Sequence, residues 1–165
     1  MVVLVPAEIH HLKALLETSK HNKIDEFILI TDEEVAPKFL LEFAIDKLIK
    51  DPVNSFWWTP RLIVVEQQIV GTIGFNSIPK LENDYSIEIG YKIVPSQRRK
   101  GFATEAVKLI LEEAFSVSKI QTVVACTRPS NQPSQRVLEK NGFIKEKSKI
   151  DLEDGEIWVW EKTRS

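Results

Sequence analysis

The sequence predicts an α/β fold with one mixed, mostly antiparallel sheet and helices on both of its faces. Three β-rich segments follow one another in the middle of the chain, and the first two lie only one or two residues apart, which is typical of an antiparallel meander. Beyond them the apolar pattern becomes helical, and strand and helix alternate twice. The 165 residues, 43% hydrophobic and 28% charged, fit a single domain spanning residues 1–165.

The first 60 residues favour a strand followed by two helices. Residues 2–5 form a short apolar strand segment, and residues 6–18 carry Ile9, Leu12 and Leu15 or Leu16 at helical spacing. A second helix is expected over residues 34–50. It ends at Asp51 because a residue before a proline is biased away from the α region.

Residues 61–67, 69–77 and 86–95 make up the predicted meander, since they are rich in β-branched and aromatic residues. Alternation along the third strand puts Ile87 and Ile89 on one face and Glu88 on the other. A carboxylate in the middle of a strand is unusual, which makes Glu88 a candidate functional residue.

A second half with alternating elements follows. Residues 103–114 carry the clearest apolar helical stripe of the chain, and residues 122–127 form a short apolar strand. A helix over residues 133–140 is closed by Asn141 and Gly142, a typical end signal. Two closing strands are expected at residues 143–150 and 156–161, with the sheet edge near Trp158 and Trp160.

Composition excludes several classes of function. The 22 basic and 24 acidic residues give a net charge of −2, so nothing draws the chain as a whole to nucleic acid or to a membrane surface. The longest apolar runs fall far short of the roughly 20 residues of a membrane span. Because the N-terminus does not resemble a secretory signal, we expect a cytoplasmic protein with neither nucleic acid nor membrane as partner.

Few side chains suit redox or metal chemistry. Cys126 is the single cysteine, and its apolar strand predicts a small buried hydrophobic residue rather than a nucleophile. His10, His11 and His21 lack partners at metal-ligand spacing, so no metal is expected. The aromatic run at residues 56–58 either packs the sheet or lines an acceptor pocket.

The segment PSQRRKG, between the third meander strand and the next helix, predicts an anion site. Arg98, Arg99 and Lys100 precede Gly101 at the start of the helix. Backbone N–H groups in a first helical turn have no intrahelical partner and lie at the positive end of the helix dipole. The chain has neither G-x-x-x-x-G-K-[ST] nor G-x-G-x-x-G, the two usual nucleotide motifs.

Arg98-x-x-Gly101-x-Ala103 is similar to the acetyl-CoA fingerprint [RQ]-x-x-G-x-[GA] of the GNAT superfamily of N-acetyltransferases. NQPSQRVLEKNGF, residues 131–143, resembles the second cofactor motif of that family, and residues 88–143 cover about a third of the chain. Within the superfamily, the chain resembles the branch named for ribosomal-protein alanine N-acetyltransferases. The resemblance implies the GNAT (acyl-CoA N-acyltransferase) fold, acetyl-CoA as cosubstrate, and a primary amine as acceptor, either a protein N-terminal α-amine or a small-molecule amine.

The resemblance also implies roles for individual residues. The CoA pyrophosphate is expected on the backbone of residues 98–104, with the pantetheine arm along the strand before it. Glu88 is the expected general base, and Ser134 the expected hydroxyl near the leaving thiolate. The cofactor-binding residues implied are Ile93, Val94, Arg98, Arg99, Lys100, Gly101, Phe102, Ala103, Thr104 and Asn131.

One position departs from the family pattern. Many members carry a tyrosine five residues before the phenylalanine of the closing Gly-Phe pair, where this chain has Leu138. A non-catalytic CoA-binding sensor or interaction module on the same fold is therefore the alternative to an enzyme. The sequence leaves a monomer and a homodimer equally open.

Overall fold

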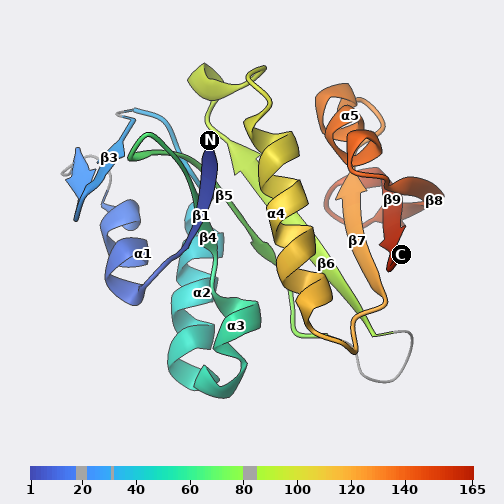
Figure 1. The fold of residues 1–165 in the computed structure, drawn as a ribbon, viewed down its shortest axis with the longest axis horizontal. Coiled ribbons are helices and arrows are strands. Elements are labelled where there is room, and N and C mark those ends of the chain that lie inside the picture. The colour runs from blue at the N-terminus through green and yellow to red at the C-terminus, as the bar shows by residue number, and fades with distance from the viewer. Residues whose placement is uncertain (18–21, 31, 80–84) are drawn as a thin grey trace.

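The computed structural model describes residues 1–17, 22–30, 32–79 and 85–165 (Figure 1). These residues form one nine-stranded sheet with the strand order β1-β4-β5-β6-β7-β9-β8, and β3 pairs with both β2 and β5. The strands are β1 (Val2–Pro6), β2 (Lys23–Ile24), β3 (Phe27–Leu29), β4 (Arg61–Val65), β5 (Gln68–Phe75), β6 (Ser86–Ile93), β7 (Thr122–Thr127), β8 (Ile144–Asp151) and β9 (Gly155–Thr163). The α-helices are α1 (Ile9–Leu16), α2 (Lys38–Lys50), α3 (Ser55–Trp58), α4 (Phe102–Ser116) and α5 (Gln132–Lys140).

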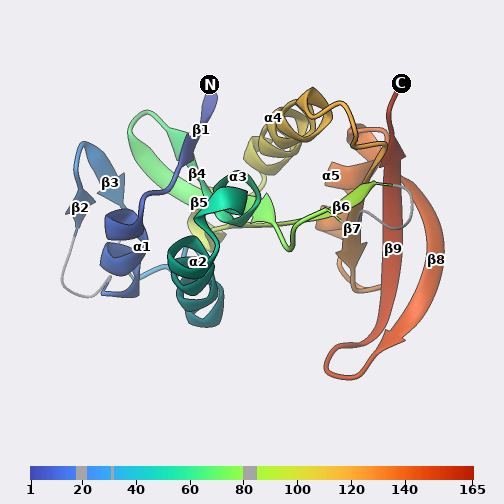
Figure 2. The ribbon, with the colours of Figure 1, turned by 90° about the horizontal axis from the view of Figure 1, so that it is seen from below.

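Helices cover both faces of this sheet, as the sequence predicts. Seen from below, α2 and α4 lie on opposite sides of the strands (Figure 2). Leu12 of α1 and Leu41 of α2 belong to one buried cluster, whereas Ile110 of α4 and Leu138 of α5 belong to another. The sheet is mostly antiparallel, with parallel pairing of β6 with β7 and of β3 with β5. The expected α/β fold class is confirmed.

The structure corrects the expected sheet edge. β9, which carries Trp158 and Trp160, lies between β7 and β8, so the edge strand is β8. Trp160 is buried, and its indole N–H donates to the Thr127 hydroxyl at 2.9 Å. Strand order depends on contacts between distant segments, which the apolar pattern of a single strand does not report.

Sequence reasoning also missed the hairpin of β2 and β3, whose strands of two and three residues are too short to show a period. In the aromatic run, Trp57 is buried and its ring packs edge-on against Phe75, with 4.9 Å between ring centroids. Trp57 therefore packs the sheet. No helix of the described segments combines the length and the apolar character needed to cross a membrane.

A polar cluster ties the turn between β2 and β3 to the start of α1. The Nε2 atoms of His10 and His11 lie 2.8 and 2.9 Å from Oδ2 of Asp25. The Nδ1 atom of His10 lies 3.3 Å from a carboxylate oxygen of Glu8. Hydrogen bonding to Asp25 raises the pKa of His10, and hydrogen bonding to His10 and then His11 lowers the pKa of Asp25.

These two pKa shifts predict a pH-dependent contribution of His10 to stability. Because the pKa of His10 is raised in the folded state, the protonated ring stabilises the fold. This contribution is complete below the unfolded pKa near 6.5 and is lost as the pH rises through the higher pKa of the folded state. Because the pKa of Asp25 is lowered in the folded state, its carboxylate contributes to stability at every pH above about 4. We therefore expect His10→Gln to lower the thermal unfolding midpoint more at pH 5 than at pH 8.

Thermal unfolding followed by circular dichroism at the two pH values measures this difference. Lys13→Gln is the matched control, because it removes an exposed cation from the same helix without touching Asp25. Equal losses for His10→Gln at both pH values would show that the ion pair with Asp25 does not contribute to stability.

Candidate functional site

The site begins where β6 loses one of its two neighbours. β6 pairs antiparallel with β5 as far as Ile93, but it pairs parallel with β7 only from Ser86 to Glu88. Past Glu88 the two central strands diverge (Figure 1). We call this divergence of β6 and β7 the splay.

Backbone groups of β6 point into the splay. The N–H of Val94 donates to the carbonyl of Val70 at 2.9 Å, which fixes the alternation of backbone direction along β6. Tyr91 and Ile93 therefore point their N–H and C=O groups away from β5. The Ile93 carbonyl accepts a hydrogen bond from Nε of Arg98 at 2.9 Å. The remaining groups of Tyr91 and Ile93 lie where an extended ligand with amide groups can pair with them.

A helix begins at the upper end of the splay. A left-handed turn, with φ of 66° at Arg99 and 82° at Gly101, leads into α4. The first helical hydrogen bond runs from the N–H of Glu105 to the carbonyl of Gly101 at 3.1 Å, so the N–H groups of residues 102–104 precede it. Apart from its two chain neighbours, no atom of the described residues lies within 4 Å of a Cβ built on Gly101, so a phosphate can approach the backbone there.

Apart from Asn131, the predicted cofactor-binding residues thus gather at the end of β6, in the turn that follows it and at the start of α4. Arg98, Arg99 and Lys100 are exposed. Val94 differs from the others, because its side chain is fully buried and its N–H and C=O are bonded to Val70 and Gln97.

Glu88 lies at the lower end, where the splay begins. Its side chain is partly buried on the face opposite Ile87 and Ile89. Asn76 Nδ2 donates to one carboxylate oxygen and Cys126 Sγ to the other, each at 3.0 Å. The sequence analysis missed both contacts.

Cys126 is therefore not the buried hydrophobic residue that its strand predicts. It is partly exposed and donates a hydrogen bond to Glu88. Burial, and then the hydrogen bond to Glu88, raise the pKa of Cys126 to about 12. The thiol stays protonated near neutral pH and is a poor nucleophile.

Asn131 and Ser134 lie at the start of α5, beside the splay. The Asn131 side chain caps the helix by accepting the Ser134 N–H at 3.3 Å. The Ser134 hydroxyl lies 2.6 Å from the hydroxyl of Tyr91, which links α5 to β6. Burial raises the pKa of Tyr91. The sequence did not single out Tyr91. Leu138 is fully buried in the core.

Within the described residues, the group of possible metal ligands is Glu8, His10 and His11. The Nδ1 atom of His11 accepts the N–H of Glu8 at 2.9 Å, which places the ring proton on Nε2, facing Asp25. Both ring nitrogens of His11 are thereby used, which does not favour a metal there. His21 lies outside the described residues.

Solved structures share this fold. An aminoglycoside acetyltransferase, AAC(6')-Ib, in complex with coenzyme A superposes with a TM-score of 0.70 at 20% identity, over 99% of this chain and 95% of the other. RimL, a ribosomal L7/L12 α-N-protein acetyltransferase, in complex with coenzyme A gives 0.73 at 19% identity, over 98% of this chain and 93% of the other.

Sequence relatives agree. The uncharacterized N-acetyltransferase p20 of Bacillus licheniformis is 32% identical over 131 residues, 79% of this chain and 68% of the relative. The chain spans about half the length of two relatives from Bacillus subtilis, YoaA and YnaD, matching 44% and 49% of their residues. The family described as "Acetyltransferase (GNAT) domain" matches residues 2–144. This chain belongs to the GNAT acetyltransferase family.

Proposed function

We propose that this protein transfers the acetyl group of acetyl-CoA to a primary amine by direct attack of the amine on the thioester. The observation that carries the proposal is the position of Glu88. Its carboxylate lies where β6 and β7 separate, on the same strand whose far end leads to the free N–H groups of α4. A proton acceptor and an anion site thus lie at the two ends of one strand of the splay.

The cofactor would lie between these ends. Its pyrophosphate would be held by the N–H groups of residues 102–104, with Arg99 and Lys100 adding attraction. The two amides of the pantetheine arm would pair with the groups that Tyr91 and Ile93 point into the splay, as an added strand does. The thiol end would then be directed toward Glu88, with Asn131 and Ser134 beside it.

The chemistry requires a neutral amine. At pH 7 a lysine-like amine with a pKa near 10.4 costs about 4.6 kcal/mol to deprotonate, whereas an α-amine costs about 1 kcal/mol. Glu88 would take this proton, directly or through one water, as the amine nitrogen attacks the thioester carbon. A backbone N–H of β6 would stabilise the oxyanion, and the carbon–sulfur bond would then break.

The departing thiolate needs little help, because a thiol has a pKa near 8.5. Ser134 is the proposed hydrogen-bond donor to it, and the Tyr91 hydroxyl, 2.6 Å away, would hold the Ser134 hydroxyl in place. Acetyl transfer through Cys126 is disfavoured, since its pKa is raised to about 12.

Two classes of acceptor follow from the relatives. One solved neighbour is AAC(6')-Ib bound to coenzyme A and kanamycin, and RimL is described as an α-N-protein acetyltransferase. We therefore propose either a small-molecule amine or a protein N-terminal α-amine. A panel of both kinds separates them.

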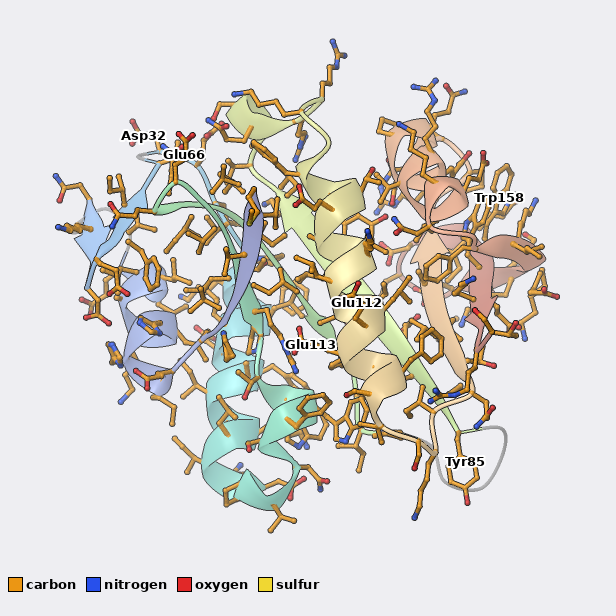
Figure 3. All side chains as sticks on the ribbon, in the orientation of Figure 1. Asp32, Glu66, Tyr85, Glu112, Glu113 and Trp158 are labelled. Atoms are coloured by element: carbon orange, nitrogen blue, oxygen red, sulfur yellow. The ribbon has the colours of Figure 1, made fainter. Side chains whose placement is uncertain are left out.

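One prediction from the proposed function concerns Glu88. Removing the base by Glu88→Gln is expected to lower kcat/KM for the best amine of the panel by about 10²- to 10⁴-fold, because a positioned general base contributes that much. Thiol release from acetyl-CoA measures turnover, and calorimetry should show unchanged CoA affinity. Glu112→Gln, on the exposed side of α4, is the control and should behave as the unmodified protein (Figure 3).

Unchanged turnover in Glu88→Gln would contradict the role of this carboxylate. Tight CoA binding by the unmodified protein without thiol release to any amine would instead support the non-catalytic alternative that Leu138 keeps open.

Another prediction from the proposed function concerns the basic turn at residues 98–101. The double variant Arg99→Gln/Lys100→Gln should bind CoA about 5- to 20-fold more weakly at low salt, since two exposed charges near a phosphate each contribute modestly. The difference should shrink at high salt because of screening. Lys119→Gln, an exposed cation beyond the other end of α4, is the control. Equal affinity of the double variant and the unmodified protein at low salt would place the phosphates elsewhere.

A further inference from the structure

We infer that Asn76 and Cys126 are positioning residues that hold the Glu88 carboxylate, one from each side of the splay. This inference rests on the proposed function of Glu88 as the base. Neither residue belongs to the sequence motifs, and the structure brings them to Glu88 from the end of β5 and from β7.

Asn76 follows β5 and lies directly opposite Glu88. Its backbone N–H donates to the Glu88 carbonyl at 2.9 Å, and its side-chain Nδ2 donates to the carboxylate at 3.0 Å. Gly90 makes room for this amide, because a Cβ at that position would lie 3.0 Å from Oδ1 of Asn76. The main chain and the side chain of Asn76 thus both hold Glu88 in place.

Cys126 reaches Glu88 from the other side of the splay. It lies two residues past Val124, which forms the last pair between β7 and β6. Because burial and the adjacent carboxylate raise its pKa to about 12, the sulfur keeps its proton and acts as a donor. A thiol donates weakly, so Asn76 should contribute more than Cys126.

The two donors leave the Glu88 carboxylate able to accept a proton. An ionised carboxylate has about four lone-pair sites, and Asn76 and Cys126 each use one on a different oxygen. Both contacts therefore leave lone pairs of the carboxylate open to accept a proton. They also fix the rotamer of a long side chain at the point where the sheet opens, which reduces the reorganisation needed for proton transfer.

A double-mutant cycle tests the positioning role. We expect kcat to fall about 10-fold in Asn76→Leu and about 3- to 10-fold in Cys126→Ala, as for lost hydrogen bonds to a charged group. Cys126→Ser, which keeps a donor, should stay within about 2-fold of the unmodified protein, and KM for acetyl-CoA should change little. In the Glu88→Gln background, Asn76→Leu and Cys126→Ala should have no further effect. Equal losses in both backgrounds would overturn the inference, because a purely structural role does not depend on Glu88.

A second measurement does not depend on turnover. Cys126 is the single cysteine, so alkylation of the intact protein by iodoacetamide, followed by mass spectrometry, reports on it alone. Since Glu88 raises the pKa of this thiol, Glu88→Gln should accelerate alkylation by about 3- to 10-fold at pH 8, whereas Glu112→Gln should not.

The two readouts separate the possible failures. An unchanged alkylation rate in Glu88→Gln overturns the contact between Cys126 and Glu88, even if turnover is lost in that variant. Faster alkylation together with full turnover in Glu88→Gln leaves the contact standing, but it rejects Glu88 as the base and with it the positioning role.

Discussion

The separation of β6 from β7 past Glu88 is the constraint on which the rest of the structure depends. Backbone N–H and C=O groups inside a protein need partners, and in the upper half of β6 the described strands supply backbone partners only on the side of β5. The Arg98 side chain satisfies the Ile93 carbonyl, and the adjacent groups are left for a ligand. A diamide arm such as that of CoA has the spacing and the donors and acceptors of a short strand, and we propose that it takes the place of the missing strand.

Contacts across the splay hold its two sides at a fixed separation. Near its start, the Glu88 carboxylate connects Asn76 with Cys126. Beside α5, the hydroxyls of Tyr91 and Ser134 meet at 2.6 Å. Both contacts use side chains rather than backbone, so they can fix the width of the opening without closing its backbone positions. The turn of residues 94–101 connects β6 to α4, and one continuous segment therefore carries both the carboxylate and the proposed anion site.

The sequence predicted those features that depend on local patterns. The meander, the apolar stripe of α4 and the glycine at the start of that helix each rest on residues close together in the chain. It did not predict the position of β8 at the edge, because strand order is set by contacts between distant segments. The partners of Glu88 were missed for the same reason, since Cys126 meets it only through the register of β6 and β7. The contact of Tyr91 with Ser134 was missed as well, because it joins β6 to the more distant α5.

Amide hydrogen exchange along β6, measured by NMR with and without saturating CoA, tests most directly whether the splay is the cofactor site. The account predicts that CoA slows exchange at the amides of Tyr91 and Ile93 by about 10-fold or more, because a bound arm gives them hydrogen-bond partners. The amide of Val94, already bonded to Val70, should change much less. Saturation with CoA without any slowing at Tyr91 and Ile93 would contradict the account and place the cofactor arm elsewhere on the fold.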